Sequence, residues 1–176
     1  MDFAEEENAS LLEKELLCEN PHLIVIKSIS KSYGVPGLRL GILASGNKKL
    51  ILELKKDVPI WNINSFAEFY MQIEEKYRDD YQTALSKLRK ERFRFQQELE
   101  KIPGLHVIPS QANYIMLEIT NGMTAAELTR RMFTRYSLLI KDLTGKLSNG
   151  QYLRVAVRTE EDNNKLLDAF RTEFSI

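Results

Sequence analysis

Residues 23–45, LIVIKSISKSYGVPGLRLGILAS, decide the fold of this chain. The stretch opens with an apolar run, residues 23–29, which is rich in β-branched side chains and predicts a buried strand. Lys31 follows this run after Ser30, and a loop with two glycines and a proline then leads to Arg39. A second apolar run, residues 40–44, predicts a second strand. The stretch therefore predicts two strands joined by a loop that carries a lysine near its start and an arginine near its end.

The polar residues of this loop suit an aldehyde that bears a phosphate. A lysine at the end of an apolar strand is poorly hydrated, and burial favours its neutral amine, which can attack a carbonyl. Ser28, Ser30 and Ser32 flank Lys31, and their hydroxyls together with the planar fork of Arg39 can bind a phosphate. Pyridoxal 5'-phosphate is such an aldehyde, so the stretch has the parts to hold that cofactor. The alternative is an ordinary strand that ends in a surface lysine and a Gly-Pro turn.

The pattern S-x-S-K-x-x-G-x-x-G-x-R-x-G resembles the cofactor-lysine motif of class I/II aminotransferases of fold type I. It is most similar to the branch that holds histidinol-phosphate aminotransferase and threonine-phosphate decarboxylase. The resemblance implies that Lys31 is the Schiff-base lysine and that Ser28, Ser30 and Arg39 hold the cofactor phosphate. It also implies an α/β fold, as the C-terminal part of a fold type I pyridoxal-phosphate-dependent transferase.

The chain has 176 residues, whereas whole enzymes of the resembling family are much longer. Those enzymes carry an upstream aspartate at the pyridine nitrogen, a glycine-led phosphate turn and a ring-stacking aromatic residue, and this chain has no counterpart of them. We therefore interpret the chain as the C-terminal half of such an enzyme. Residues 1–85 are expected to be a remnant of the large cofactor-binding domain, and residues 86–176 a small α+β domain. We expect the isolated chain to be inactive, with residues 1–75 rearranged or covered by another copy.

Composition excludes several other classes of protein. Lysine plus arginine equals aspartate plus glutamate at 25 each, and this zero net charge argues against a nucleic-acid binder. No apolar run approaches the length of a membrane span, and the acidic start does not look like a signal peptide. Cys18 is the only cysteine, and His22 and His106 lie far apart, so neither a disulfide framework nor a metal site is expected. These features fit a protein of the reducing cytoplasm without a membrane partner.

Apolar periodicity and capping residues predict the remaining elements. Capping boxes are expected at Ser10–Glu13 and Ser65–Glu68, and Thr124 and Thr159 are expected to begin two further helices. The expected helices cover or begin at 10–18, 48–56, 65, 77–102, 124 and 159, and the expected later strands cover 105–108, 113–119, 137–140 and 152–157.

The longest expected helix, residues 77–102, has one apolar stripe and many charges. The stripe consists of Tyr77, Tyr81, Leu85, Leu88, Phe95, Leu99 and Ile102. The charges are expected to form a solvated face, or alternatively to bind an acidic partner, and they belong to Lys87, Arg89, Lys90, Glu91, Arg92 and Arg94.

A second group of cations lies near the C-terminus. In the run 152–158, Arg154 and Arg158 are expected to share one strand face, which on its own could be solvent decoration. The run LRVAVRT resembles the family strand whose first arginine binds the substrate carboxylate, which implies that role for Arg154. Lys141 stands where the phosphate-substrate branch has an arginine for the substrate's distal phosphate. Lysine binds a phosphate as a point charge without the fork geometry, so the chain departs from that branch here.

The resemblance implies a homodimeric aminotransferase that transfers an amino group between an amino acid and a 2-oxo acid. Two alternatives stay open. One is decarboxylation of a threonine-phosphate-like amino acid on the same scaffold, which the Val-Ala-Val-Arg run after Arg154 slightly favours. The other is a non-catalytic fragment that dimerises or docks through the long helix.

Overall fold

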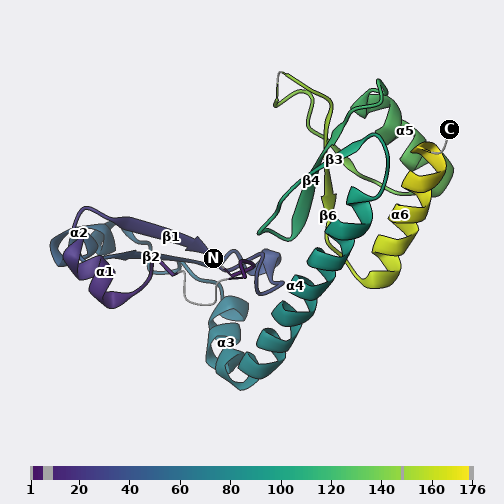
Figure 1. Ribbon diagram of the computed structural model, residues 1–176. Coiled ribbons are helices and arrows are strands. Elements are labelled where there is room, and N and C mark those ends of the chain that lie inside the picture. Colours follow the sequence, from purple (N-terminus) through teal and green to yellow (C-terminus); the bar gives the residue numbers. More distant parts are fainter. Residues whose placement is uncertain (1, 6–9, 148, 175–176) are drawn as a thin grey trace. The chain divides into compact units, whose positions relative to one another are not determined.

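The computed structural model describes residues 2–5, 10–147 and 149–174 (Figure 1). The described residues fall into two compact units. One unit contains Asp2 and residues 10–83, and we call it the hairpin unit. The other contains residues 3–5, 84–147 and 149–174, and we call it the sheet unit.

The hairpin unit is built around two antiparallel strands. Strand β1 (Ile24–Ser28) pairs with β2 (Gly41–Ser45), and the register runs from Ile24 opposite Ser45 to Ser28 opposite Gly41. The remaining elements of the unit are helical: α1 (Lys14–Glu19), the 3-10 turn η1 (Pro36–Leu38), α2 (Lys48–Asp57), α3 (Ser65–Ile73), η2 (Glu74–Tyr77) and the first turns of α4 (Arg78–Glu100).

Strand β1 is exposed, although the sequence predicts a buried strand. The side chains of Ile24 and Ile26 are 48% and 77% exposed. Among the described residues β1 pairs with β2 alone, so its other edge has no strand partner there. An apolar strand sequence predicts the chain's preference for extended backbone, but the neighbours that would bury it have to come from elsewhere.

Two predicted helix starts are wrong in detail. Helix α1 begins at Lys14, and the Ser10 hydroxyl instead accepts a bond from the Leu12 amide at 3.1 Å, so the expected capping box does not form. Helix α3 is capped by Asn64, whose side-chain oxygen accepts from the Ala67 amide at 2.9 Å. Asparagine caps a helix as well as serine does, and the sequence has Asn64 directly before the serine that the pattern favours.

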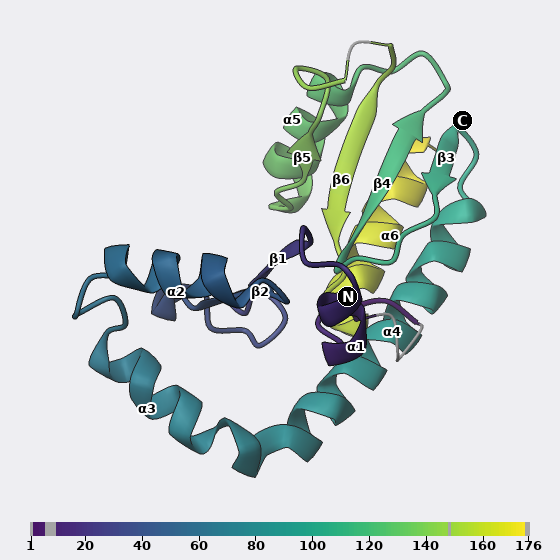
Figure 2. The same cartoon turned by 90° about the vertical axis from the view of Figure 1, so that its left-hand side faces the viewer.

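The sheet unit contains a four-stranded antiparallel sheet in the order β3-β4-β6-β5. Figure 2 shows α6 lying behind β4 and β6, against one face of the sheet. The elements are the remainder of α4, β3 (Leu105–Ile108), β4 (Tyr114–Ile119), α5 (Ala125–Tyr136), β5 (Lys141–Asp142), β6 (Tyr152–Ala156) and α6 (Glu160–Phe174).

The core of the sheet unit follows the sequence pattern closely. Alternate residues of β4 and β6 are buried, and the two sets meet in one apolar cluster with the helices. Thr124 caps α5 by accepting from the Glu127 amide at 3.1 Å, and Thr159 caps α6 by accepting from the Asp162 amide at 3.3 Å. The expected inward-facing side chains are all buried or nearly so: Leu128, Met132, Leu166, Leu167, Phe170 and Phe174.

Two expectations for the sheet unit are wrong. The strand expected at 137–140 is displaced, because Ser137 ends α5 in the left-handed conformation at φ 56°, and the chain pairs only at β5. Arg92 was expected on a solvated helix face but is 1% exposed. It follows Leu88 by four residues and precedes Phe95 by three, so it lies on the apolar stripe of α4.

In the part of the chain that the structure describes, no helix is both long enough and apolar enough to cross a membrane. The described residues also contain no cluster of His, Cys, Asp or Glu side chains with the geometry of a metal site.

Candidate functional site

The hairpin places the predicted cofactor residues near one another along the backbone. Beyond the last paired residues, the Ile29 amide donates to the Leu40 oxygen at 3.2 Å, which continues the register of β1 and β2. In an antiparallel pair that register brings Ser30 opposite Arg39. Lys31 follows in a tight turn, in which the Gly34 amide donates to the Lys31 oxygen at 3.3 Å. Gly34 has φ 69°, a conformation that glycine adopts readily.

The exposure of these residues differs from the expectation in one important respect. Lys31 was expected to be poorly hydrated, but its side chain is exposed. Ser28 is exposed as well, whereas Ser30 is 7% exposed. The expected desolvation of the amine needs atoms packed over the turn, and the described residues of the hairpin unit do not supply them.

Arg39 has the least common backbone of the group. It ends η1 in the left-handed conformation at φ 56°, which few residues other than glycine adopt. Its side chain is exposed, and no ion pair joins it to another residue of the described ranges. Strained backbone of this kind is common at binding sites, where it directs a side chain toward a ligand.

A pocket of about 430 Å³ in the hairpin unit includes Arg39 in its wall. Its other polar residues include Tyr33, Asn64, Tyr70 and Glu74. Burial raises the pKa of the Tyr70 phenol, and the Glu74 carboxylate adds to that rise. The structure thus brings Arg39 to a pocket, while Lys31, Ser28 and Ser30 are not among the residues described as lining it.

A polar cluster that no sequence motif predicts lies next to the lysine turn. The Lys27 ammonium lies 2.6 Å from an Asp2 carboxylate oxygen and 5.9 Å from the Tyr33 ring centre. Tyr33 stacks on Tyr81 with ring centres 4.3 Å apart. Burial raises the pKa of the Asp2 carboxyl, but hydrogen bonds from Lys27 and Ser32 outweigh it and hold that pKa below its usual range. Burial also raises the pKa of the Tyr81 phenol. These partners are far apart in the sequence, so no local pattern reveals them.

The predicted substrate residues lie together in the sheet unit. Lys141 of β5 is the direct cross-strand partner of Arg154 of β6. The Arg154 guanidinium lies 5.1 Å from the centre of the Tyr114 ring, at the start of β4. All three side chains are exposed, and no ion pair joins either cation to another residue of the described part. Like charges opposite one another destabilise a sheet unless an anion lies between them, so this pair suits an anionic ligand.

Arg158 does not share this arrangement. It was expected on the same strand face as Arg154, but β6 ends at Ala156 and Arg158 lies in the turn beyond it. Its Nε donates to the Asp162 carboxylate at 2.9 Å, within the first turn of α6. The structure therefore distinguishes the two arginines. Arg154 has no carboxylate partner among the described residues, whereas Arg158 forms an ion pair with Asp162 at the start of α6.

The comparison of folds identifies the class of protein to which the chain belongs, and the comparison of sequences then identifies its family. The chain superposes on the histidinol-phosphate aminotransferase of Clostridium acetobutylicum with a TM-score of 0.85 and 26% identity, over 98% of this chain and 51% of that one. The fold is therefore that of the fold type I enzymes that depend on pyridoxal phosphate, as the sequence predicts. The family model for aminotransferase class I and II matches residues 1–170, and the chain belongs to that family.

Curated relatives have more than one activity. The chain is 34% identical over 171 residues to a CMP-5'-(3-aminopropyl)phosphonate synthase of Streptomyces rubellomurinus, which covers 96% of this chain and 27% of the relative. It is 30% identical over 155 residues to an L-serine phosphate decarboxylase of Sulfurospirillum multivorans, which covers 86% of this chain and 39% of the relative. The chain thus spans well under half the length of these relatives.

Proposed function

We propose that the chain supplies the C-terminal part of the active site of a pyridoxal-phosphate-dependent aminotransferase, which moves an amino group between an amino acid and a 2-oxo acid. The observation that carries this proposal is the family match over residues 1–170 together with a lysine turn at the mouth of the β1–β2 hairpin. In this reading residues 1–85 belong to the large cofactor-binding domain and residues 86–176 to the small domain. The division of the described residues between Thr83 and Ala84 supports this assignment.

The donor set of the hairpin fits the cofactor's phosphate. Arg39 offers a planar fork without a carboxylate partner among the described residues, and Ser30 and Ser28 offer hydroxyls at neighbouring backbone positions. We propose that these three residues hold the phosphate. When bound, pyridoxal phosphate supplies an electron sink for the bond that breaks at the substrate's α-carbon.

We propose that Lys31 holds the cofactor covalently and then acts on the substrate. Its amine would take up the α-proton of the substrate as a base and hold it for the return step as an acid. Lys31 is exposed in the hairpin unit, so this role predicts that another part of the enzyme covers it.

We propose that Arg154 binds the α-carboxylate of the substrate and fixes the bond that breaks. A guanidinium pairs with a carboxylate through two parallel hydrogen bonds, which orients the substrate as well as binding it. Lys141, directly across from it, is proposed to bind a second anionic group of the substrate. A lysine ammonium can bind either a carboxylate or a phosphate, so this pair does not identify which amino acid is the donor.

A decarboxylase is the second candidate, and one observation favours it specifically. The L-serine phosphate decarboxylase of Sulfurospirillum multivorans is 30% identical over 155 residues. Both activities would use the same lysine and the same arginine, and they differ in which bond of the substrate's α-carbon breaks, the bond to hydrogen or the bond to the carboxylate. The products therefore decide between them.

The test uses a protein that comprises the whole length of the family and carries this chain. We expect pyridoxal phosphate to give an absorbance band that Lys31→Ala abolishes, whereas Lys49→Ala, an exposed lysine of α2, keeps it. A new 2-oxo acid identifies the aminotransferase, and carbon dioxide identifies the decarboxylase. A protein without the band and without either product would be the non-catalytic fragment, and the proposal would be wrong.

The two arginines of the sheet unit provide a sharper test of the substrate site. Arg154→Lys keeps the charge but loses the fork, so we expect kcat/KM for amino acids to fall at least about a hundredfold, while the cofactor stays bound. Arg158→Lys is the matched control, because its guanidinium is engaged by Asp162. Equal losses in both variants, or no loss at Arg154, would contradict the assignment.

We also propose that the enzyme is a homodimer. Ile60 and Trp61, in the connection between α2 and α3, are 91% and 90% exposed, and Phe66 in α3 is 77% exposed. Large apolar side chains that are exposed close together in the sequence are typical of a surface that another chain covers. Sedimentation of the protein with Trp61→Asp checks the proposal. If the dimer uses this surface, the variant should dissociate into monomers at a higher protein concentration than the unsubstituted protein does.

A further inference from the structure

Arg92 is a fully buried cation in the middle of the sheet unit. Its Nη1 donates to the backbone oxygens of Phe3 at 2.7 Å and Ala112 at 3.2 Å, and its Nη2 lies 3.4 Å from a Glu5 carboxylate oxygen. Taking a guanidinium out of water is costly, and an apolar side chain of similar size is often no less stable in such a place. The property that distinguishes Arg92 from an apolar residue is that it fixes the position of the carbonyl groups it binds.

The carbonyl of Ala112 belongs to the turn that leads into β4. The same turn is held by Ser110, whose hydroxyl oxygen accepts from the Ala112 amide at 3.1 Å. The next carbonyl, that of Asn113, accepts from the Val157 amide at 2.9 Å, just beyond the end of β6. Arg92 therefore fixes the point at which β4 starts and meets the end of β6.

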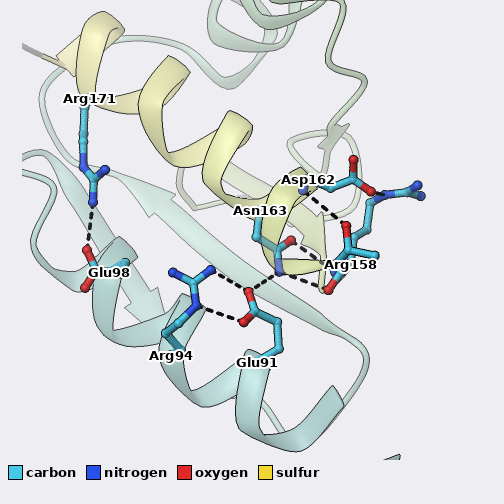
Figure 3. A network of polar contacts seen from close by, with 8 residues as sticks. Glu91, Arg94, Glu98, Arg158, Asp162, Asn163 and Arg171 are labelled. Atoms are coloured by element: carbon cyan, nitrogen blue, oxygen red, sulfur yellow. Dashed lines mark hydrogen bonds and ion pairs between the residues drawn. The ribbon is translucent and has the colours of Figure 1, made fainter. Parts of the chain in front are cut away.

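Glu91, the neighbour of Arg92 in α4, is linked through Asn163 of α6 to Arg158, just beyond the end of β6 (Figure 3). The buried Asn163 donates from Nδ2 to Glu91 at 2.8 Å and to the Arg158 oxygen at 3.2 Å, and its Oδ1 accepts from the Arg158 amide at 3.1 Å. Arg94 donates two bonds to the Glu91 carboxylate, and together with the bond from Asn163 they outweigh burial and hold the pKa of Glu91 below its usual range. Glu91 and Asn163 thus fix the turn that follows β6.

These two sets of bonds hold the backbone near one pair of side chains, Tyr114 and Arg154. Tyr114, the first residue of β4, is opposite Ala156 at the end of β6, and its ring lies 5.1 Å from the Arg154 guanidinium. We propose that Arg92 and the Glu91–Asn163 pair are positioning residues for Arg154: they hold the backbone that sets the Tyr114 ring against the substrate-binding guanidinium. This inference rests on the role proposed above for Arg154.

The first measurement needs no ligand. In the 176-residue chain, NMR reports the contact between the Tyr114 ring and the Arg154 side chain through cross-relaxation and the ring-current shift of the Arg154 Nε proton. Arg92→Lys keeps the charge, but its side chain is one bond shorter than that of arginine and has no second nitrogen for Glu5, so we expect the contact to be lost or much weakened. Lys90→Met removes an exposed cation from the same helix and serves as the matched control, with the contact retained.

The second measurement connects position to binding, with inorganic phosphate as the probe. Titration followed at the Arg154 Nε proton should show an affinity about tenfold lower in Arg92→Lys, a change of about 1.4 kcal/mol, and unchanged in Lys90→Met. Arg154→Lys separates the two proposals, and because it lacks that proton its titration is followed at the neighbouring Tyr114 ring protons. If it leaves phosphate affinity unchanged, the proposed substrate site is wrong, while the NMR contact still decides the positioning role.

Asn163→Ala repeats the experiment from the other strand, so the result does not depend on one variant. It should also weaken the Tyr114–Arg154 contact, because the turn after β6 loses its bridge to Glu91. An unchanged contact and unchanged phosphate affinity in folded Arg92→Lys and Asn163→Ala would overturn the proposal. Failure of both variants to fold would also overturn it, because their role would then be structural alone.

Discussion

The two units of the chain treat their apolar residues in opposite ways. In the sheet unit the apolar positions of β4, β6, α5 and α6 join in one buried cluster. In the hairpin unit only Leu17, Leu40 and Ala67 are buried apolar residues of the described part, while Trp61 and Ile60 are almost fully exposed. The sheet unit thus buries its own apolar residues, whereas most apolar residues of the hairpin unit need neighbours that the unit does not contain.

This difference separates the two halves of the proposed site. Arg154 and Lys141 belong to the unit that closes its own core, so their geometry is fixed within this chain. Lys31 and Arg39 belong to the unit that does not, and both side chains are exposed. The difference teaches that the proposed substrate site depends less on residues outside this chain than the proposed cofactor site does.

The largest effect that follows is on activity. We expect the 176-residue chain alone, mixed with pyridoxal phosphate, an amino acid and a 2-oxo acid, to show no measurable transamination. The reason is that the hairpin unit leaves Lys31 exposed and the chain spans 51% of a solved relative. Turnover near an ordinary kcat of about 1–10³ per second would show that the hairpin unit is complete and would remove the contrast between the units.

The next effect is on stability and compares two phenylalanines. Phe170 is fully buried in the sheet unit, so Phe170→Ala should lower the free energy of unfolding by about 3–5 kcal/mol. Phe69 of the hairpin unit is 60% exposed, and Phe69→Ala should change it by less than about 0.5 kcal/mol. Urea denaturation followed by circular dichroism measures both. Similar losses for the two variants would mean that the hairpin unit has a core of its own.

A smaller effect is expected at two glycines. Gly104 has φ 84°, and a Cβ there would lie 2.9 Å from the Cβ of Asn121 and 3.1 Å from the Phe174 ring. Gly104→Ala should therefore cost about 1–3 kcal/mol of sheet-unit stability. Gly37→Ala in the hairpin unit meets nothing within 4 Å and should cost nothing. Calorimetric melting of the two variants tests this, and a loss at Gly37 equal to that at Gly104 contradicts it.

The smallest effect is the pH dependence of the sheet unit. Burial raises the pKa of the Glu173 carboxyl, but hydrogen bonds from Arg131, Tyr136 and Arg135 outweigh burial and hold it below the ordinary value of 4.5. A depressed folded-state pKa adds stability above the unfolded value, and this stability is lost as the pH falls through the folded value. The sheet unit should therefore lose stability below about pH 4.5.

Glu173→Gln tests this titration directly. The variant should be less stable than the unsubstituted chain at pH 7, and the two should converge as the pH falls toward 3. Glu161→Gln, whose side chain is 80% exposed, is the control and should leave the pH profile unchanged. If the profile of Glu173→Gln stays parallel to that of the unsubstituted chain, Glu173 is not responsible for the acid sensitivity.

Apolar periodicity predicted the sheet unit well, because the periodic apolar residues of that unit are buried against one another. The alternation in β4 and the spacing of Leu166, Phe170 and Phe174 in α6 are local patterns, and the packing confirms them. The charge of Arg92 favours a surface position, whereas its spacing from Leu88 and Phe95 places it on the apolar stripe. Position on the helix was the better guide.

The hairpin unit was harder to predict because burial depends on partners. The pattern gave the two strands and their loop, but it could not show that β1 has one paired neighbour among the described residues. The assigned roles of Lys31, Ser28, Ser30, Arg39, Arg154 and Lys141 came from resemblance, and they remain predictions. The register of β1 and β2 and the pairing of Lys141 with Arg154 are consistent with those roles but do not test them.

The β1–β2 hairpin also governs how the chain behaves in concentrated solution. A two-stranded ribbon with exposed isoleucines at positions 24 and 26 offers its outer amides and carbonyls to any extended segment that meets it. Lys27 interrupts this apolar edge with a charge, but its ion pair with Asp2 partly neutralises that charge. Precipitation should therefore depend steeply on protein concentration, and the first 45 residues, rather than the well-packed C-terminal part, should set the limit at which the chain can be kept in solution.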